Sequence, residues 1–289
     1  MSNLPSDYHF SQSSLQDYAD CPRRFQLRYL LNLAWPAVEA EPVQENEQRM
    51  LMGGIFHQLI HQHLLGLPRE RLTRIAADEH LARWWHNYMK HAADLSSLLS
   101  LAGLQATSDL LLHPEVLLSA PFGNYRLVAK YDLIAIQPGV RIFIIDWKTT
   151  RKPPSRHWLE QRLQTRVYPY LLVQAGAHLN AGSPIEPGQV EMIYWFAEQP
   201  DEIRRLPYNH GKYIEDDRYL VSLVSEIESL GGAEFTLTSD RRGCSYCKYR
   251  SYCDRGIQAG ALDEMESGLE VIDEGEIAID FEHIAEIEF

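Results

Sequence analysis

Apolar residues spaced three and four positions apart dominate the first 112 residues, and this spacing predicts helices. One helix is expected within 11–31, interrupted at Cys21-Pro22 because proline removes a helical hydrogen bond. A second helix is expected over 49–66, and further helices between about 70 and 112. The apolar face of the helix over 49–66 is expected to carry Leu51, Ile55 and Leu59.

Beyond residue 112 the apolar residues alternate or run together, which predicts strands. Strands are expected at 115–120, 125–136 and 141–148, and the last two are joined by a turn at Pro138-Gly139. A helix follows at about 157–178, and then come strands at 190–197 and near 203–208 and a helix at about 213–230. This order predicts one α/β domain over residues 1–260 with a helical insertion at about 70–112.

The strand before residue 148 ends in two charged residues, in the stretch "FIIDWKTT". Side chains alternate between the two faces of a strand, so Asp146 and Lys148 share one face. If Pro138 to Val140 forms a three-residue loop, Gln137 pairs with Arg141 and the same register sets Asp132 opposite Asp146. A two-residue loop would instead put the two aspartates on opposite faces.

Two opposed carboxylates repel each other unless a cation lies between them. Asp132 and Asp146 are therefore candidate ligands of a hard divalent metal, and Mg or Mn suits oxygen ligands beside a phosphate. A metal held in this way, with Lys148 next to it, is suited to hydrolysing a phosphodiester bond. Lys148 is expected to orient the attacking water and to stabilise developing negative charge.

Charge is distributed unevenly along the chain. The formal net charge is -13, but the acidic tail (261–289) holds eleven acidic residues and no Lys or Arg. The stretch 141–166 has seven basic and two acidic residues, which favours a polyanionic partner there, although a solvated helix face is the alternative. Arg151, Lys152 and Arg156 are expected to contact DNA phosphates. The tail either keeps the protein soluble or folds back onto the basic surface.

The motifs at the two aspartates resemble those of a known family. "YDLI" followed by "IIDWKTT" resembles motifs two and three of the PD-(D/E)XK nuclease superfamily, specifically its RecB-like branch, which includes CRISPR-associated and recombination-repair exonucleases. The resemblance covers about residues 10–256. It implies a restriction-endonuclease-like α/β core, a central mixed sheet flanked by helices, with an N-terminal helical elaboration and a C-terminal cysteine cluster.

Four further site residues follow from the same resemblance. "GGIFH" is similar to the Gly-x-x-x-His motif of the branch, which implies that His57 is a metal ligand. Glu115 matches an acidic residue that precedes the strands. "QTRVY" resembles a Gln-x-x-x-Tyr helix motif, which implies that Gln164 and Tyr168 position the phosphate or the lysine, and their i, i+4 spacing puts them on one helix face.

The four cysteines form one early and one late group. Cys21 stands alone, and "CSYCKYRSYC" supplies Cys244, Cys247 and Cys253. This arrangement differs from the paired knuckles of a zinc ribbon. It resembles the iron-sulfur staple of RecB-like nucleases, which implies a 4Fe-4S cluster with four thiolate ligands and a structural role. A four-cysteine zinc site and two disulfides are the alternatives, and a cytoplasmic compartment disfavours disulfides.

Together these features predict a metal-dependent DNA nuclease, an exonuclease on single-stranded DNA or DNA ends in repair, recombination or CRISPR adaptation. A catalytically inactive, nuclease-like iron-sulfur DNA-binding subunit is the alternative, and RNA is a third possible substrate. No Walker A sequence is present, so unwinding would require a separate helicase or a CRISPR or repair partner. No secretory signal or membrane-spanning stretch is seen, and a cytoplasmic protein is expected.

Overall fold

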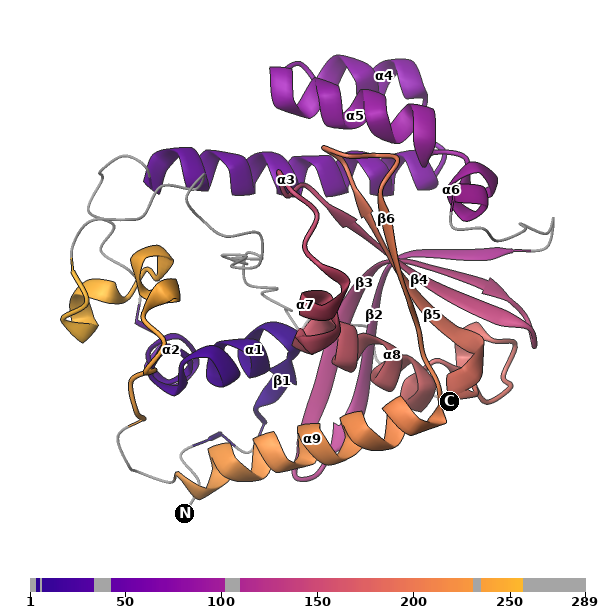
Figure 1. Ribbon diagram of the computed structural model, residues 1–289. Coiled ribbons are helices and arrows are strands. Elements are labelled where there is room, and N and C mark those ends of the chain that lie inside the picture. Colours follow the sequence, from indigo (N-terminus) through magenta and orange to yellow (C-terminus); the bar gives the residue numbers. More distant parts are fainter. Residues whose placement is uncertain (1–3, 6, 34–42, 102–109, 231–234, 257–289) are drawn as a thin grey trace.

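A mixed six-stranded sheet lies at the centre of the molecule (Figure 1). The computed structural model describes residues 4–5, 7–33, 43–101, 110–230 and 235–256. The strands follow the order β1-β3-β4-β5-β6, and β2 pairs with β3. Their bounds are β1 (His9–Ser11), β2 (Leu111–Phe122), β3 (Tyr125–Gln137), β4 (Arg141–Lys148), β5 (Val190–Phe196) and β6 (Ile203–Pro207).

Both faces of the sheet are covered by helices, so each face has its own apolar core. One core includes Ile142 and Ile144 of β4, and the other includes Phe143, Ile145 and Trp147 of the same strand. Burial on both faces explains why this strand has an almost continuous apolar sequence.

The first core packs against α1 (Gln12–Asp20), α8 (Leu163–Ala175) and α9 (His210–Ser229) (Figure 1). The second packs against α3 (Val43–Leu64), and α4 (Arg69–Ile75), α5 (Glu79–His91) and α6 (Leu95–Leu101) lie on the same side. The helices α7 (Arg156–Gln161) and α8 connect the parallel strands β4 and β5. The predicted α/β class with a central sheet flanked by helices is confirmed.

The predicted elements after residue 112 are present with small shifts. The helix expected at about 157–178 is two helices separated at Arg162, and the second ends at Ala175. The last helix begins at His210, earlier than predicted, because the Asn209 side chain accepts a hydrogen bond from the Lys212 N–H and caps it. The predicted break at Cys21-Pro22 separates α1 from α2 (Pro22–Phe25), which continues into a π-helical turn over Gln26–Leu30.

Two predictions about the first half of the chain are wrong, and one strand was not predicted. Helices do not extend to residue 112, because β2 already begins at Leu111; a short apolar run such as Leu110 to Leu112 fits either element. Leu51 is 67% exposed, whereas Leu59 is buried and Ile55 is partly buried. The short strand β1 was not predicted; it pairs in parallel with β3, a contact between distant segments that three residues cannot signal. Among the described residues, no helix is long and apolar enough to cross a membrane.

Candidate active site

The register of β3 and β4 brings the two aspartates together. Gln137 pairs with Arg141, as the three-residue loop requires, and the ladder continues to the pair Leu133 and Ile145. Asp132 and Asp146 are the next residues beyond this last pair. There the backbone N–H of Trp147 donates to Oδ2 of Asp132 at 2.9 Å, so the carboxylate is fixed against the neighbouring strand.

Asp146, Lys148 and Gln164 form a buried, mutually bonded group. The Lys148 Nζ lies 3.1 Å from Oδ2 of Asp146 and donates to Oε1 of Gln164 at 3.0 Å. The Gln164 Nε2 donates to Oδ1 of Asp146 at 2.7 Å. The exposed fractions are only 3% for Asp146, 8% for Lys148 and 6% for Gln164. We call these three residues with Asp132 the Asp-Lys centre.

His57 lies on α3, which covers the face of the sheet opposite to α8, and its side chain contacts the Asp-Lys centre. Its Nδ1 lies 3.1 Å from Oδ1 of Asp132. Burial opposes a charge on the imidazole, but the Asp132 carboxylate outweighs this effect and raises the pKa of His57 to about 9. Burial likewise opposes ionisation of Asp132, but the charge on His57 lowers the net pKa of this carboxyl. The Asp132 carboxylate therefore favours a positive charge at the site that the His57 imidazole occupies.

Glu115 lies on β2 at the level of Asp132. The ladder of β2 and β3 pairs Pro114 with Leu133 and Val116 with Tyr131, but the pair between them is missing. Glu115 has a φ of 53°, in the left-handed region that few non-glycine residues adopt, and its carboxylate forms an ion pair with Lys130. The sheet is thus irregular where the acidic side chains of β2, β3 and β4 align, and such distortions re-aim side chains.

Tyr168 supports the helix that carries Gln164. Its ring packs on the ring of Tyr131 with centroids 4.7 Å apart, and its carbonyl accepts a hydrogen bond from the Tyr131 hydroxyl at 2.8 Å. Because Tyr168 is buried in the first core, it fixes α8 against β3.

A metal site of three ligands is not preformed in the described residues: no group of three or more His, Cys, Asp or Glu side chains is placed to hold a metal ion. The donor chemistry nevertheless suits a hard divalent cation, since an imidazole and two carboxylates adjoin. In the structure, the His57 imidazole and the Lys148 ammonium compensate the charges of the two carboxylates.

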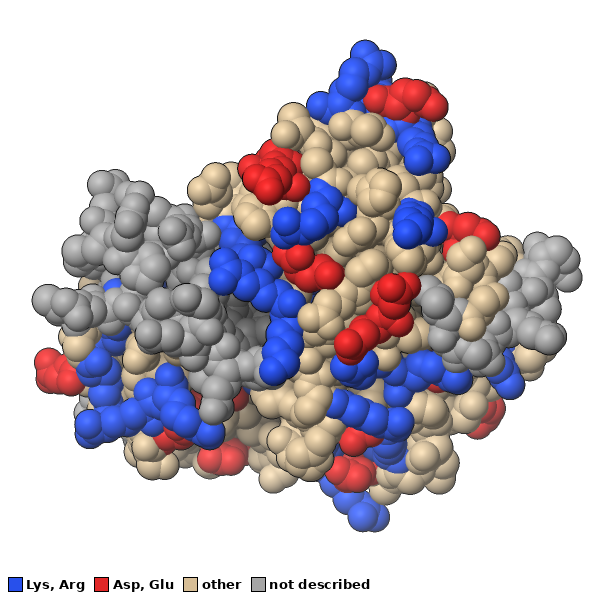
Figure 2. All heavy atoms as spheres, turned by 45° about the horizontal axis from the view of Figure 1, so that its top comes forward, with Lys and Arg blue, Asp and Glu red and all other residues tan. Residues whose placement is uncertain are grey.

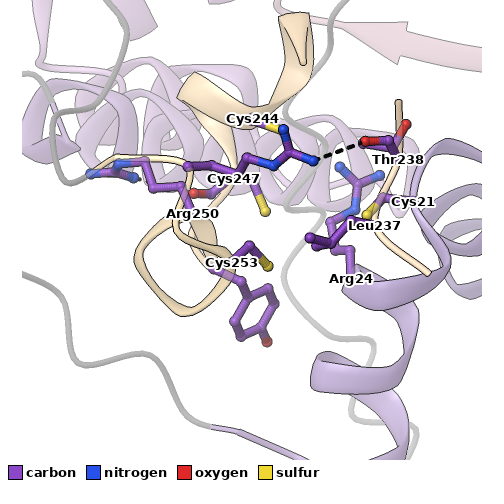
Figure 3. A pocket seen from close by; sticks show the side chains of 10 residues that line it. Cys21, Arg24, Leu237, Thr238, Cys244, Cys247, Arg250 and Cys253 are labelled. Atoms are coloured by element: carbon purple, nitrogen blue, oxygen red, sulfur yellow. Dashed lines mark hydrogen bonds between the residues drawn. The ribbon is translucent and has the colours of Figure 1, made fainter. Parts of the chain in front are cut away.

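The four cysteines line one pocket (Figure 3). Cys21 lies between α1 and α2. Cys244 lies in the short 3-10 turn Arg242–Tyr246, Cys247 directly follows that turn, and Cys253 ends the turn Arg250–Cys253. Arg24, Arg250 and Arg255 also line this cysteine pocket. All four cysteines are free thiols, and burial raises the pKa of Cys247 to about 11.

Basic side chains cluster on the surface near α7. Arg151 and Lys152 are exposed in the loop after β4, and Arg156 is exposed but donates to Oε1 of Glu160 at 3.0 Å. Figure 2 shows several Lys and Arg side chains along one face of the molecule. The stretch that was predicted to contact phosphate is therefore accessible to a polyanion.

Two residues near the Asp-Lys centre were missed by the sequence analysis. Arg49 on α3 donates to the backbone carbonyl of Thr149 at 2.8 Å and lies 3.4 Å from Oε1 of Glu198. Gln16 on α1 accepts a hydrogen bond from the Leu163 N–H at 2.9 Å, immediately before Gln164. Both are polar helix residues that form hydrogen bonds with residues distant in the sequence, and neither belongs to a recognisable motif.

Comparison with known proteins identifies the family. The family model described as the PD-(D/E)XK nuclease superfamily matches residues 9–254. The chain belongs to the PD-(D/E)XK nuclease superfamily. No curated protein matches this PD-(D/E)XK chain significantly.

Two solved structures are similar in fold to this superfamily member. The first is described as a "Putative exonuclease" from Eubacterium rectale; it has 11% identity and a TM-score of 0.52, with 91% of this chain and 94% of that chain covered. The second, SSO0001, has 15% identity and a TM-score of 0.40, with 88% of this chain and 90% of that chain covered. At these identities the first structure supports the fold alone.

Proposed function

We propose that this PD-(D/E)XK nuclease is a metal-dependent deoxyribonuclease of the RecB-like branch, an exonuclease that acts on single-stranded DNA or DNA ends in repair, recombination or CRISPR adaptation. The observation that carries the proposal is the Asp-Lys centre, in which a buried lysine is bonded to a carboxylate and a glutamine beside a second carboxylate. A purely structural lysine would more commonly lie at the surface, because burying its charge is costly.

His57, Asp132 and Asp146 would hold the Mg or Mn ion. When bound, a divalent ion polarises the phosphate and makes water a stronger acid. At neutral pH the His57 imidazole carries a proton shared with Asp132, and this proton must leave before Nδ1 can bind a metal. Asp132 is already oriented by the Trp147 N–H, so its position does not depend on the ion.

Lys148 would stabilise the charge that develops on the phosphate oxygens. Gln164 accepts one hydrogen bond from the ammonium, and Asp146 lies within ion-pair distance, so the side chain is held in one direction before substrate binds. A charged ammonium between two such partners is a donor rather than a general base. Gln164 therefore acts through Lys148 and Asp146 rather than on the substrate.

Arg151, Lys152 and Arg156 would bind the sugar-phosphate backbone of DNA, because they are exposed on the loop and helix that directly follow Lys148. The description of the Eubacterium rectale structure as a "Putative exonuclease" is consistent with a substrate that has ends. The sequence has no Walker A motif for ATP binding, so a helicase or repair partner would have to unwind the DNA.

The cysteine pocket would hold a 4Fe-4S cluster. Four thiols and three arginines line it, and the arginines would offset the negative charge of a thiolate-bound cluster. A lone early cysteine combined with a late group of three is unlike the paired knuckles of a zinc ribbon and resembles an iron-sulfur staple, so we favour a cluster over one zinc ion. Since burial keeps Cys247 protonated, loading releases protons.

The test is cleavage of end-labelled single-stranded DNA by anaerobically purified protein with Mg, Mn or EDTA, in parallel with an RNA of the same sequence. Lys148→Ala is expected to abolish the metal-dependent cleavage. Lys212→Ala is the matched control, because this lysine is on α9, where it donates to the Pro207 carbonyl. Absence of cleavage by metal-supplied, cluster-loaded protein would instead support an inactive DNA-binding subunit.

A further inference from the structure

We propose that Gln16 is a positioning residue for the nuclease reaction: it caps α8 from a distance and thereby fixes Gln164 against Lys148 and Asp146. This inference rests on the proposed function for its kinetic consequence, and on hydrogen bonds of the structure for the placement itself.

The start of α8 lacks a capping hydrogen bond from its own N-cap side chain. Arg162 occupies the N-cap position, and its side chain makes no capping hydrogen bond. The first N–H groups of a helix need an acceptor from outside the helix. Oε1 of Gln16 supplies one, because it accepts from the Leu163 N–H at 2.9 Å. Gln16 therefore performs for α8 the role that Ser155 performs for α7.

Gln164 is the residue directly after the one that Gln16 caps. Gln164 follows Leu163 in the first turn of α8 and bonds with both Lys148 and Asp146. If the first turn of α8 unwinds, the Gln164 amide is no longer held in one position. Lys148 then loses the Gln164 Oε1 acceptor that orients its ammonium group. Small displacements of a positioning group lower reaction rates strongly.

The Gln16 side chain is itself held in place by Asp20. Its Nε2 donates to Oδ1 of Asp20 at 2.8 Å, and this carboxylate also bonds to Arg24 at 3.0 Å through Oδ2. Arg24 lines the cysteine pocket. A continuous series of polar contacts thus leads from the cysteine pocket, through Asp20 and Gln16, to the first turn of the helix that carries Gln164.

The experiment compares Gln16→Ala with Asn209→Ala in the full-length, cluster-loaded protein. Asn209 caps α9, so its loss should cost comparable stability without affecting α8. Gln16→Ala is expected to lower kcat roughly 3- to 10-fold with KM unchanged, in line with the loss of one helix cap. Gln16→Glu keeps an acceptor for the Leu163 N–H but sets a carboxylate against Asp20 in place of the amide donor, so it should restore kcat only in part, and Asn209→Ala should leave kcat at the wild-type value.

Hydrogen exchange provides a readout that does not require activity. Amide exchange in a peptide that covers 163–168 should accelerate in Gln16→Ala and not in Asn209→Ala. Unchanged exchange there, or a kcat equal to that of Asn209→Ala, would overturn the inference. If the wild-type protein does not cleave DNA, the proposed function fails, and the exchange measurement still decides whether Gln16 holds α8.

Discussion

The Asp-Lys centre and the cysteine pocket are built in opposite ways. The aspartates and the lysine of the centre come from two neighbouring strands, and their positions follow from one hairpin register inside a sheet with a core on each face. The cysteine pocket joins the helical start of the chain to two short 3-10 turns near residue 250.

The segment 235–256, which holds these turns, contacts the start of the chain through an aromatic pair and hydrogen bonds. Phe235 stacks on Phe25 with ring centroids 6.0 Å apart, the Tyr249 hydroxyl donates to the Leu33 carbonyl at 3.2 Å, and the Arg23 N–H donates to the Thr236 carbonyl at 3.1 Å. The geometry of the Asp-Lys centre thus depends on the register of neighbouring strands. The cysteine pocket depends on bringing Cys21 close to residues more than two hundred positions later in the chain. Damage to the pocket should therefore leave most of the centre intact.

The largest expected effect comes from Asp146→Asn. The substitution keeps the side-chain shape but removes the charge that faces Lys148 and a proposed metal ligand, so cleavage should fall at least about 100-fold. The measurement is the initial rate of cleavage with Mn, with circular dichroism to check the fold. Asp201→Asn, at an exposed carboxylate near His91, is the control. A rate within a factor of about three of wild type would exclude this site.

Gln164→Ala should have the next largest effect. It leaves Asp146 and Lys148 in place but removes the amide that bonds with both, so kcat should fall roughly 10- to 100-fold. Gln161→Ala, at an exposed position of α7, controls for loss of a glutamine. A drop in substrate affinity without a drop in kcat would indicate that Gln164 binds substrate instead of positioning the lysine.

Cys247→Ser addresses the other region. Iron content should fall from about four atoms per chain, and limited proteolysis should cut faster within 235–256. The cleavage rate should fall less than in Gln164→Ala, because the sheet and its register do not involve the pocket. Ser251→Ala in the adjacent turn is the control. A loss of activity as large as that of Asp146→Asn would contradict the separation of the two regions.

The smallest effect is expected from the ion-pair group behind the centre. Arg49, which is 16% exposed, links Glu198 to the Thr149 carbonyl, whereas Arg83, which is 44% exposed, contacts Glu198 at the surface. Arg49→Ala should lower the free energy of unfolding by about 1–2 kcal/mol, and Arg83→Ala by less than about 1 kcal/mol. Thermal unfolding would show this difference as a few degrees, and equal shifts would contradict it.

The sequence contained enough information to predict most of the sheet, but it left the pairing of the aspartates open between a two-residue and a three-residue loop. Apolar runs bounded by turn residues predict β3 and β4, and the length of the Pro138 to Val140 loop determines the register. Asp146 and Lys148 share a face because strand periodicity is two, and the ion pair between them follows from that. These are local properties, which adjacent residues express.

The interactions that could not be predicted are those between distant segments. The contact of His57 with Asp132 depends on how α3 lies across the sheet, and the pairing of β1 depends on a three-residue segment. The resemblance proposed a role for Gln164, but its two hydrogen bonds depend on the break at Arg162 that sets where α8 begins. Leu51 was assigned to the buried face from its spacing alone, although spacing does not show how far the covering core extends.

The distance along the chain between Cys21 and Cys244 also sets an order of events during synthesis. At about 5–20 residues per second, tens of seconds pass between the appearance of the first cysteine and that of the other three. All residues of the hairpin of β3 and β4 are synthesised within that interval. The four thiols of the cysteine pocket can therefore come together only after all residues of the Asp-Lys centre have been synthesised.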